Sequence, residues 1–101
     1  MHTRKRIELI IERMAYKRAC RILEAVGIKG YTVTSAMAGY GNGTRWASDT
    51  DISDSNEMVV MIAIADEETI TECLEQLSSL LGAHIGVVST CDVQVLRPEL
   101  F

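Results

Sequence analysis

The chain has 101 residues, a length that fits one domain over residues 1–101, because two cores of useful size would need more sequence. A hydrophobic content of 48% with a single proline predicts a packed globular protein, and the aromatic content of 5% implies an aliphatic core. The net charge of −4 argues against nucleic-acid binding. Residues 1–21 nevertheless carry seven Lys or Arg against two Glu, so this segment is either an anion-binding face or a solvated surface.

The lengths of the apolar runs and the pattern of cysteines indicate where in the cell the protein is located. Runs such as residues 58–65 are far shorter than the roughly 20 residues that a membrane-spanning helix needs, and no signal-peptide stretch follows the basic N-terminus. Cys20, Cys73 and Cys91 are odd in number and lie in apolar patterns, which favours reduced thiols in the core over disulfides. A cytoplasmic protein is therefore expected.

The first half of the chain predicts a strand, a helix and a second strand. Apolar side chains alternate in residues 6–12, which is typical of a half-buried strand. In residues 15–26 they recur at spacings of three and four, and Gly27 follows where a helix end favours glycine. Residues 31–37 are rich in β-branched side chains and predict the second strand.

The second half predicts a strand, a helix and a last strand. Residues 58–65 form a continuous apolar run, which indicates a deeply buried strand. Asp66 is the expected cap of a helix that ends at Gly82. Residues 86–96 alternate and predict the final strand. The apolar stripe of this helix comprises Ile70, Cys73, Leu74, Leu77 and Leu81.

This βαββαβ order predicts an α+β, ferredoxin-like fold, with a four-stranded antiparallel sheet and both helices on one face. The strands are too apolar for the uncovered face of the sheet to meet water. Association with further subunits is therefore expected.

An 18-residue polar stretch, Gly39 to Asn56, separates the second and third strands. A structureless connection of this length in so small a domain indicates a functional loop. Its first part combines glycines, whose N–H groups can approach an anion, with an arginine that can grip phosphate, and a flexible turn is the alternative. The candidate residues for phosphate or another small anion are Asn42, Gly43 and Arg45.

The second part of this loop is acidic. An EF-hand beginning at Asp49 would need glycine in place of Asp54 and glutamate in place of Val60, so a calcium site is rejected and a solvated tip is expected. Trp46 is either a partner contact or a side chain tucked against its own subunit.

Candidate catalytic and metal-ligating groups are few. His2 and His84 lie at opposite ends of the chain without cysteine or carboxylate at metal-ligand spacing, so no metal is expected. We expect His84 to be a capping or surface histidine. No serine lies in a GxSxG motif and no Walker motif closes the glycine loop, so no catalytic residue is assigned.

Four segments carry a resemblance to a known family. Residues 27–34 (GIKGYTVT), 39–41 (GYG), 65–67 (ADE) and 91–97 (CDVQVLR) resemble the base of the T-loop, the second helix start and the last strand of PII signalling proteins. Within that family the short C-terminus and the glycine-asparagine loop are similar to PII-like proteins associated with carboxysomes and bicarbonate uptake.

The resemblance implies a homotrimer with three nucleotide sites in clefts between subunits, where Thr32 and the backbone near Ile64 hold adenine. Ribose and phosphate would lie near Gly39, Gly41 and Arg97. The implied nucleotide-binding residues are Gly30, Tyr31, Thr32, Gly39, Tyr40, Gly41, Ile64, Gly86, Val87 and Arg97.

Two departures from the family refine these expectations. Residues 83–88 lack the lysine that the family places near the distal phosphates, which favours ADP or AMP over ATP as ligand. The loop tip lacks a tyrosine, so regulation by covalent modification is not expected.

The predicted function is a non-enzymatic sensor, in which adenine nucleotide, together with bicarbonate near Arg45, orders the T-loop for docking on a bicarbonate transporter or another partner. No cofactor is expected beyond these ligands. One alternative is an acylphosphatase-like hydrolase that binds phosphate through Arg45 or Arg97 and places water with Asn42. The other is a scaffold that presents Trp46 to a partner regardless of nucleotide.

Overall fold

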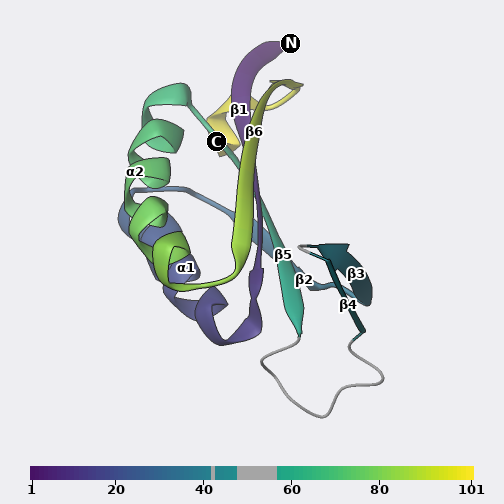
Figure 1. The fold of residues 1–101 in the computed structure, drawn as a ribbon. Coiled ribbons are helices and arrows are strands. Elements are labelled where there is room, and N and C mark those ends of the chain that lie inside the picture. The colour runs from purple at the N-terminus through teal and green to yellow at the C-terminus, as the bar shows by residue number, and fades with distance from the viewer. Residues whose placement is uncertain (42, 48–56) are drawn as a thin grey trace.

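The computed structural model describes residues 1–41, 43–47 and 57–101, and of residues 44–47 the backbone. Asn42 and the acidic tip of the loop lie outside the described residues. The elements follow one another as shown in Figure 1. They are β1 (His2–Glu12), α1 (Arg13–Ala25), β2 (Tyr31–Ser35), β3 (Ala38–Gly41), β4 (Thr44–Ala47), β5 (Met58–Ala65), α2 (Glu67–Ala83), β6 (Gly86–Val95) and a 3-10 turn (Pro98–Leu100).

One antiparallel sheet organises the molecule. Its strand order is β2-β5-β1-β6, with β1 paired to both β5 and β6. Both helices cover the same face of this sheet, and the opposite face is left without a helix (Figure 1). The expected ferredoxin-like α+β fold is therefore confirmed.

The core lies between the sheet and the two helices. Alternate residues of β1, such as Ile7 and Ile11, are at most 2% exposed and point toward the helices. Ala19 and Leu77 are fully buried on the facing sides of α1 and α2. Full burial of an aliphatic side chain of this size stabilises a fold by roughly 1.5–3 kcal/mol, so this layer is the main source of stability. Of the predicted α2 stripe, Ile70, Cys73 and Leu77 are buried and Leu74 and Leu81 partly so, while Leu80 is buried as well.

Local side chains and backbone geometry set the helix ends. The Asp66 carboxylate accepts a hydrogen bond from the Thr69 N–H at 2.8 Å, as expected of an N-cap. At the end of α1, Gly27 adopts a φ of 94° while the Ile28 N–H bonds to the Leu23 carbonyl, the Schellman arrangement. No helix among the described residues has the length and apolarity required to span a membrane.

Several expected boundaries were wrong. The first strand begins at His2 rather than at residue 6. Residues 2–5, which include basic side chains, already pair with β6 and therefore belong to the sheet. Helix α2 continues through Gly82 to Ala83 and ends on His84 in an extended conformation, so no left-handed glycine is needed there.

The stretch from Gly39 to Asn56 was predicted to lack regular structure, and this was wrong for residues 39–41 and 44–47, which belong to two strands, while residues 48–56 lie outside the described part of the chain. β3 and β4 pair in a hairpin whose register, Gly41 opposite Thr44, leaves a two-residue connection. Gly43 in that connection has a φ of 77°, a conformation that glycine adopts without strain. Asn-Gly is the strongest short-range hairpin signal, so the sequence carried the information.

The expectation that all three cysteines fill the core holds for Cys73, which is fully buried. Burial raises the pKa of its thiol to about 11. Cys20 is half-buried against the core. Cys91 is exposed, because it stands opposite Arg6 on the face of the sheet that the helices leave open.

Candidate functional site

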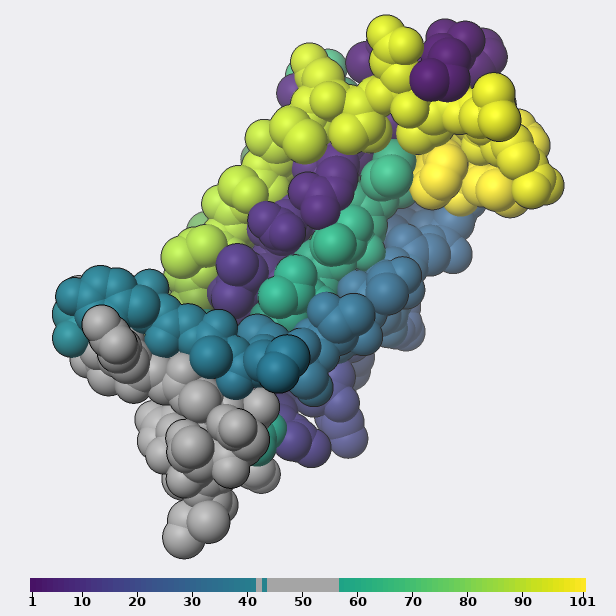
Figure 2. Space-filling view, turned by 90° about the vertical axis from the view of Figure 1, so that its right-hand side faces the viewer, coloured from purple at the N-terminus to yellow at the C-terminus, as the bar shows by residue number. Residues whose placement is uncertain are grey.

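The open face of the sheet, which no helix of the described residues covers, carries apolar side chains. Figure 2 looks onto it and shows β6, β1, β5 and β2 side by side. Ile10, Ile62 and Ile64 point to this face and are only half-buried, while Val87 is 62% exposed. Apolar side chains in this arrangement are typical of a surface that another molecule covers.

Three of the predicted nucleotide-binding residues lie at the start of β2. The Thr32 side chain is exposed on the open face, opposite Ile62. Gly30 precedes the strand, and a β-carbon added there would meet no atom within 4 Å, so internal packing does not require glycine at this position. Thr32 is therefore accessible from the side that the helices leave free, and Gly30 is exposed next to it in sequence.

The Tyr31 side chain, the third of these, lies on the other face. Its register partner is the buried Ala63, and its hydroxyl donates a hydrogen bond to the Glu24 carboxylate of α1. This bond, followed by contact with Cys20, raises the pKa of the Tyr31 hydroxyl. The structure therefore separates the Tyr31 side chain from Thr32, and only the backbone of Tyr31 is available to the open side.

The C-terminal segment returns to the start of β2. The Lys29 ammonium donates to the Glu99 carbonyl at 3.3 Å, and Arg97 forms an exposed ion pair with the Glu99 carboxylate, Nε to Oε1, at 3.6 Å. Ile64 lies one residue beyond the Tyr31–Ala63 pair, at the same end of the sheet. Arg97, Gly30 and Ile64 are thus gathered at one end of the β2 edge.

The β3–β4 hairpin carries the remaining glycines and projects on the open-face side of the sheet (Figure 1). Tyr40 is 70% exposed and stands opposite Arg45 in the register. Gly39 stands opposite Trp46. Around Gly41, as around Gly30, an added β-carbon would meet nothing within 4 Å. The glycine run therefore forms a structured arm with accessible backbone.

Gly86 and Val87 lie at the opposite edge of the sheet. Val87 pairs with Ile10, which pairs with Val60, which pairs with Thr34. Three strand spacings separate the outer members of this row, a distance of about 14 Å. Within one chain the two groups of predicted residues therefore do not meet.

The structure also gives Gly86 a packing role. A β-carbon at this position would lie 2.9 Å from the Ile10 carbonyl oxygen and 2.9 Å from Leu81 Cδ2. Such contacts are too close for any side chain, so Gly86 is required by the approach of β6 to β1 and α2.

A polar cluster that the sequence analysis missed joins β1, α1 and α2. His84 Nδ1 lies 2.6 Å from Glu12 Oε1, and His84 Nε2 lies 2.6 Å from the Arg18 guanidinium. The side chains of His84 and Glu12 are 13% and 10% exposed, so His84 is not a surface histidine. It does occupy the C-cap position of α2, as the capping alternative expected. The two are 72 residues apart in sequence, and no local pattern signals the contact.

Among the residues that the structure describes, no three His, Cys, Asp or Glu side chains come together as a metal site. The fold and the hairpin define the class of the protein: a ferredoxin-like domain with a long insertion, which contains the β3–β4 hairpin, between strands β2 and β5 of its sheet. The family model described as nitrogen regulatory protein P-II matches residues 4–100, and the chain belongs to that family.

Solved structures support this assignment. CPII, a nitrogen regulatory PII-like protein from Thiomonas intermedia K12 solved with ADP, AMP and bicarbonate, is 30% identical with a TM-score of 0.90, over 99% of this chain and 94% of that one. A PII-like signalling protein from Thermus thermophilus shares the fold, with 22% identity, a TM-score of 0.82 and coverage of 97% and 94%. Bacillus subtilis GlnK shares it at 9% identity and a TM-score of 0.69, with 100% of both chains covered. A comparison with curated proteins gave no match.

Proposed function

We propose that this chain is a non-enzymatic signalling protein that binds ADP or AMP in preference to ATP at clefts between the subunits of a homotrimer. The observation that carries the proposal is the similarity, over 99% of the chain, to a PII-like protein solved with ADP, AMP and bicarbonate. The protein acts in the cytoplasm and responds to inorganic-carbon or energy status.

Each cleft combines the β2 edge of one subunit with the β6 edge of the next. Thr32 offers a hydroxyl and its backbone to the purine, and Ile64 supplies apolar contact. Arg97 is 68% exposed, and among the described residues its side-chain contact is the exposed ion pair with Glu99, so it can turn toward a phosphate. Val87 of the adjacent subunit closes the cleft. The separation of about 14 Å between the two edges of one sheet is the reason that a second subunit is needed.

The trimer buries the open face of the sheet. Ile10, Ile62 and Ile64 line its centre, and covering them removes apolar surface from water at roughly 25 cal/mol per Å². The expected state is a trimer in sedimentation equilibrium at micromolar concentration. Ile62→Arg places a charge in this interface and converts the trimer to monomer. Thr71→Arg, at an exposed position of α2 on the other side of the molecule, adds the same charge outside the interface and should leave the trimer intact.

The hairpin and the segment that follows it provide the signal. Bicarbonate is held near Asn42, Gly43 and Arg45, beside the glycines that approach the nucleotide. Binding of both ligands favours one arrangement of this T-loop, and Trp46 then contacts a partner such as a bicarbonate transporter. Tyr40, which is 70% exposed, lies at the base of this arm.

Titration calorimetry of the trimer with AMP, ADP and ATP, each with and without bicarbonate, tests the proposal. ADP and AMP are expected to bind at micromolar concentrations, with ATP weaker because no lysine lies in residues 83–88. Binding of no nucleotide below millimolar concentration would overturn it. Phosphate release from an acyl phosphate that depends on Arg45 would instead establish the hydrolase.

A further inference from the structure

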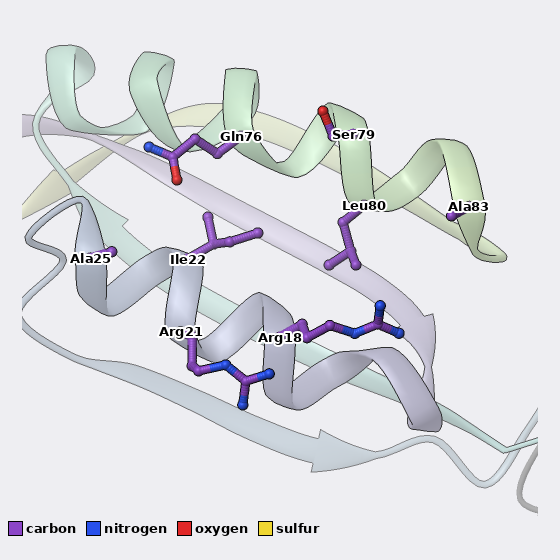
Figure 3. A pocket seen from close by; sticks show the side chains of 8 residues that line it. All are labelled: Arg18, Arg21, Ile22, Ala25, Gln76, Ser79, Leu80 and Ala83. Atoms are coloured by element: carbon purple, nitrogen blue, oxygen red, sulfur yellow. The ribbon is translucent and has the colours of Figure 1, made fainter.

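A groove of about 470 Å³ runs between α1 and α2, on the side of the molecule away from the open sheet face (Figure 3). Ile22 and Leu80 point toward each other across it from the two helices. Two arginines of α1 and two neutral polar residues of α2 flank this apolar floor. The lining residues are Arg18, Arg21, Ile22, Ala25, Gln76, Ser79, Leu80 and Ala83.

No carboxylate of the described residues neutralises the two arginines of the groove, in contrast to two other cations of the chain. Lys5 is paired with Asp92 and Arg13 with Glu57. Within residues 1–41, 43–47 and 57–101, neither Arg18 nor Arg21 forms an ion pair with a carboxylate. The groove therefore holds two positive charges without acidic partners in a protein whose net charge is −4.

Arg18 is also held in place. Its guanidinium donates to His84 Nε2 at 2.6 Å, and His84 Nδ1 in turn donates to Glu12 at 2.6 Å, where both partners are largely buried. An arginine fixed in this way loses less conformational freedom on binding an anion than a freely rotating side chain does. Arg21 lies three residues further along α1, so carboxylates one helical turn apart can reach both.

We propose that this groove is a docking site for an acidic amphipathic helix of a partner protein. Apolar side chains of that helix pack on Ile22 and Leu80, and its carboxylates pair with Arg18 and Arg21. Inorganic phosphate could neither cover the partly exposed Ile22 side chain nor fill a groove of about 470 Å³, which favours a peptide as the occupant. The local positive charge of the groove steers an acidic partner toward it in an otherwise acidic protein.

The site does not depend on the nucleotide-binding function, because it lies on the helix layer. The test therefore uses nucleotide-free protein. The probe is a synthetic helical peptide of leucine, alanine and glutamate, in which leucines form one face and glutamates flank them. A peptide of the same composition in scrambled order is the control, and binding is followed by backbone amide NMR shifts and fluorescence anisotropy.

The ordered peptide is expected to shift amides of α1 and α2 and to bind more weakly as salt increases. Arg21→Gln should weaken binding about fivefold, by the loss of one charge-assisted contact, without disturbing the Arg18–His84 bond. Lys17→Gln removes the same charge from an exposed position of α1 outside the groove and should change affinity less than about twofold.

Three results would overturn the proposal. The scrambled peptide could bind as tightly as the ordered one, or Arg21→Gln could match Lys17→Gln. Inorganic phosphate alone could shift the same amides and block the peptide, which would indicate a small-anion site. Circular dichroism and the melting temperature of each variant verify that the groove is still formed.

Discussion

The Glu12 carboxylate lies 2.6 Å from the imidazole Nδ1 of His84 and joins the end of β1 to the end of α2. The same oxygen accepts the Ile85 N–H at 3.3 Å, and Arg18 occupies the other nitrogen of His84. A carboxylate that is 10% exposed requires such partners, since an unpaired charge at this depth is costly. The cluster therefore fixes the corner where β1, α1 and α2 meet.

His84→Ala should lower the free energy of unfolding by about 2–3 kcal/mol, because it leaves Glu12 buried without its main partner. Urea denaturation monitored by circular dichroism measures the change. The double variant Glu12→Gln/His84→Ala should recover part of the loss. Glu99→Gln, which removes an exposed ion pair with Arg97, is the matched control and should cost less than about 0.5 kcal/mol.

Gly86→Ala should destabilise the protein by about 1–3 kcal/mol, because the added methyl group lies 2.9 Å from the Ile10 carbonyl and from Leu81. Gly82→Ala provides the comparison. Nothing lies within 4 Å of a β-carbon at position 82, which is inside α2, so alanine there should stabilise by about 0.5–1 kcal/mol. Equal melting temperatures for the two variants would contradict the packing role of Gly86.

Asp66→Ala should cost about 1 kcal/mol at pH 7, because α2 loses the acceptor of the Thr69 N–H. That hydrogen bond lowers the pKa of Asp66 in the folded protein. A lowered folded pKa stabilises the fold above the unfolded value of about 3.9, and this stabilisation is lost as pH falls through the folded pKa.

The pH dependence is measured by urea unfolding at several values between pH 7 and pH 2. Asp66→Asn keeps a capping oxygen that does not titrate. The advantage of the native carboxylate over Asp66→Asn should therefore shrink steadily below about pH 4. A constant difference across this range would show that the Asp66 charge contributes nothing to the cap.

Substitutions at two adjacent residues of β2 should change the affinity for nucleotide by different amounts. Thr32→Val removes the hydroxyl on the open face and should weaken ADP binding about tenfold, or about 1.4 kcal/mol. Tyr31→Phe removes a hydroxyl that bonds to Glu24 on the helix side and should change affinity less than about twofold. Calorimetry on both variants, with trimer formation verified, separates the two faces. A larger loss of ADP affinity for Tyr31→Phe than for Thr32→Val would place the ligand on the helix side of the sheet and contradict the proposal.

The sequence predicted the order of the elements because each carries its own periodic signal. The hairpin of β3 and β4, from Ala38 to Ala47, was missed, although Asn42-Gly43 is a turn signal, because glycine-rich strands have weak β patterning. Gly86 was predicted to bind the ligand on the basis of the resemblance alone. Its role in packing was missed because it depends on contacts with Ile10 and Leu81, which no short motif encodes. Cys91 was assigned to the core because alternation cannot say which face is covered.

By itself the sequence determined the ferredoxin-like element order, the Asp66 cap and the membership in the PII family, since these depend on local spacing and short motifs. Only the tertiary structure decided that Thr32 and Tyr31 face opposite sides, that Val87 lies at the far edge, and that Glu12 meets His84. A period of two assigns alternate residues to two faces but does not specify strand order or neighbours. Contacts across 72 residues arise only when the sheet is assembled.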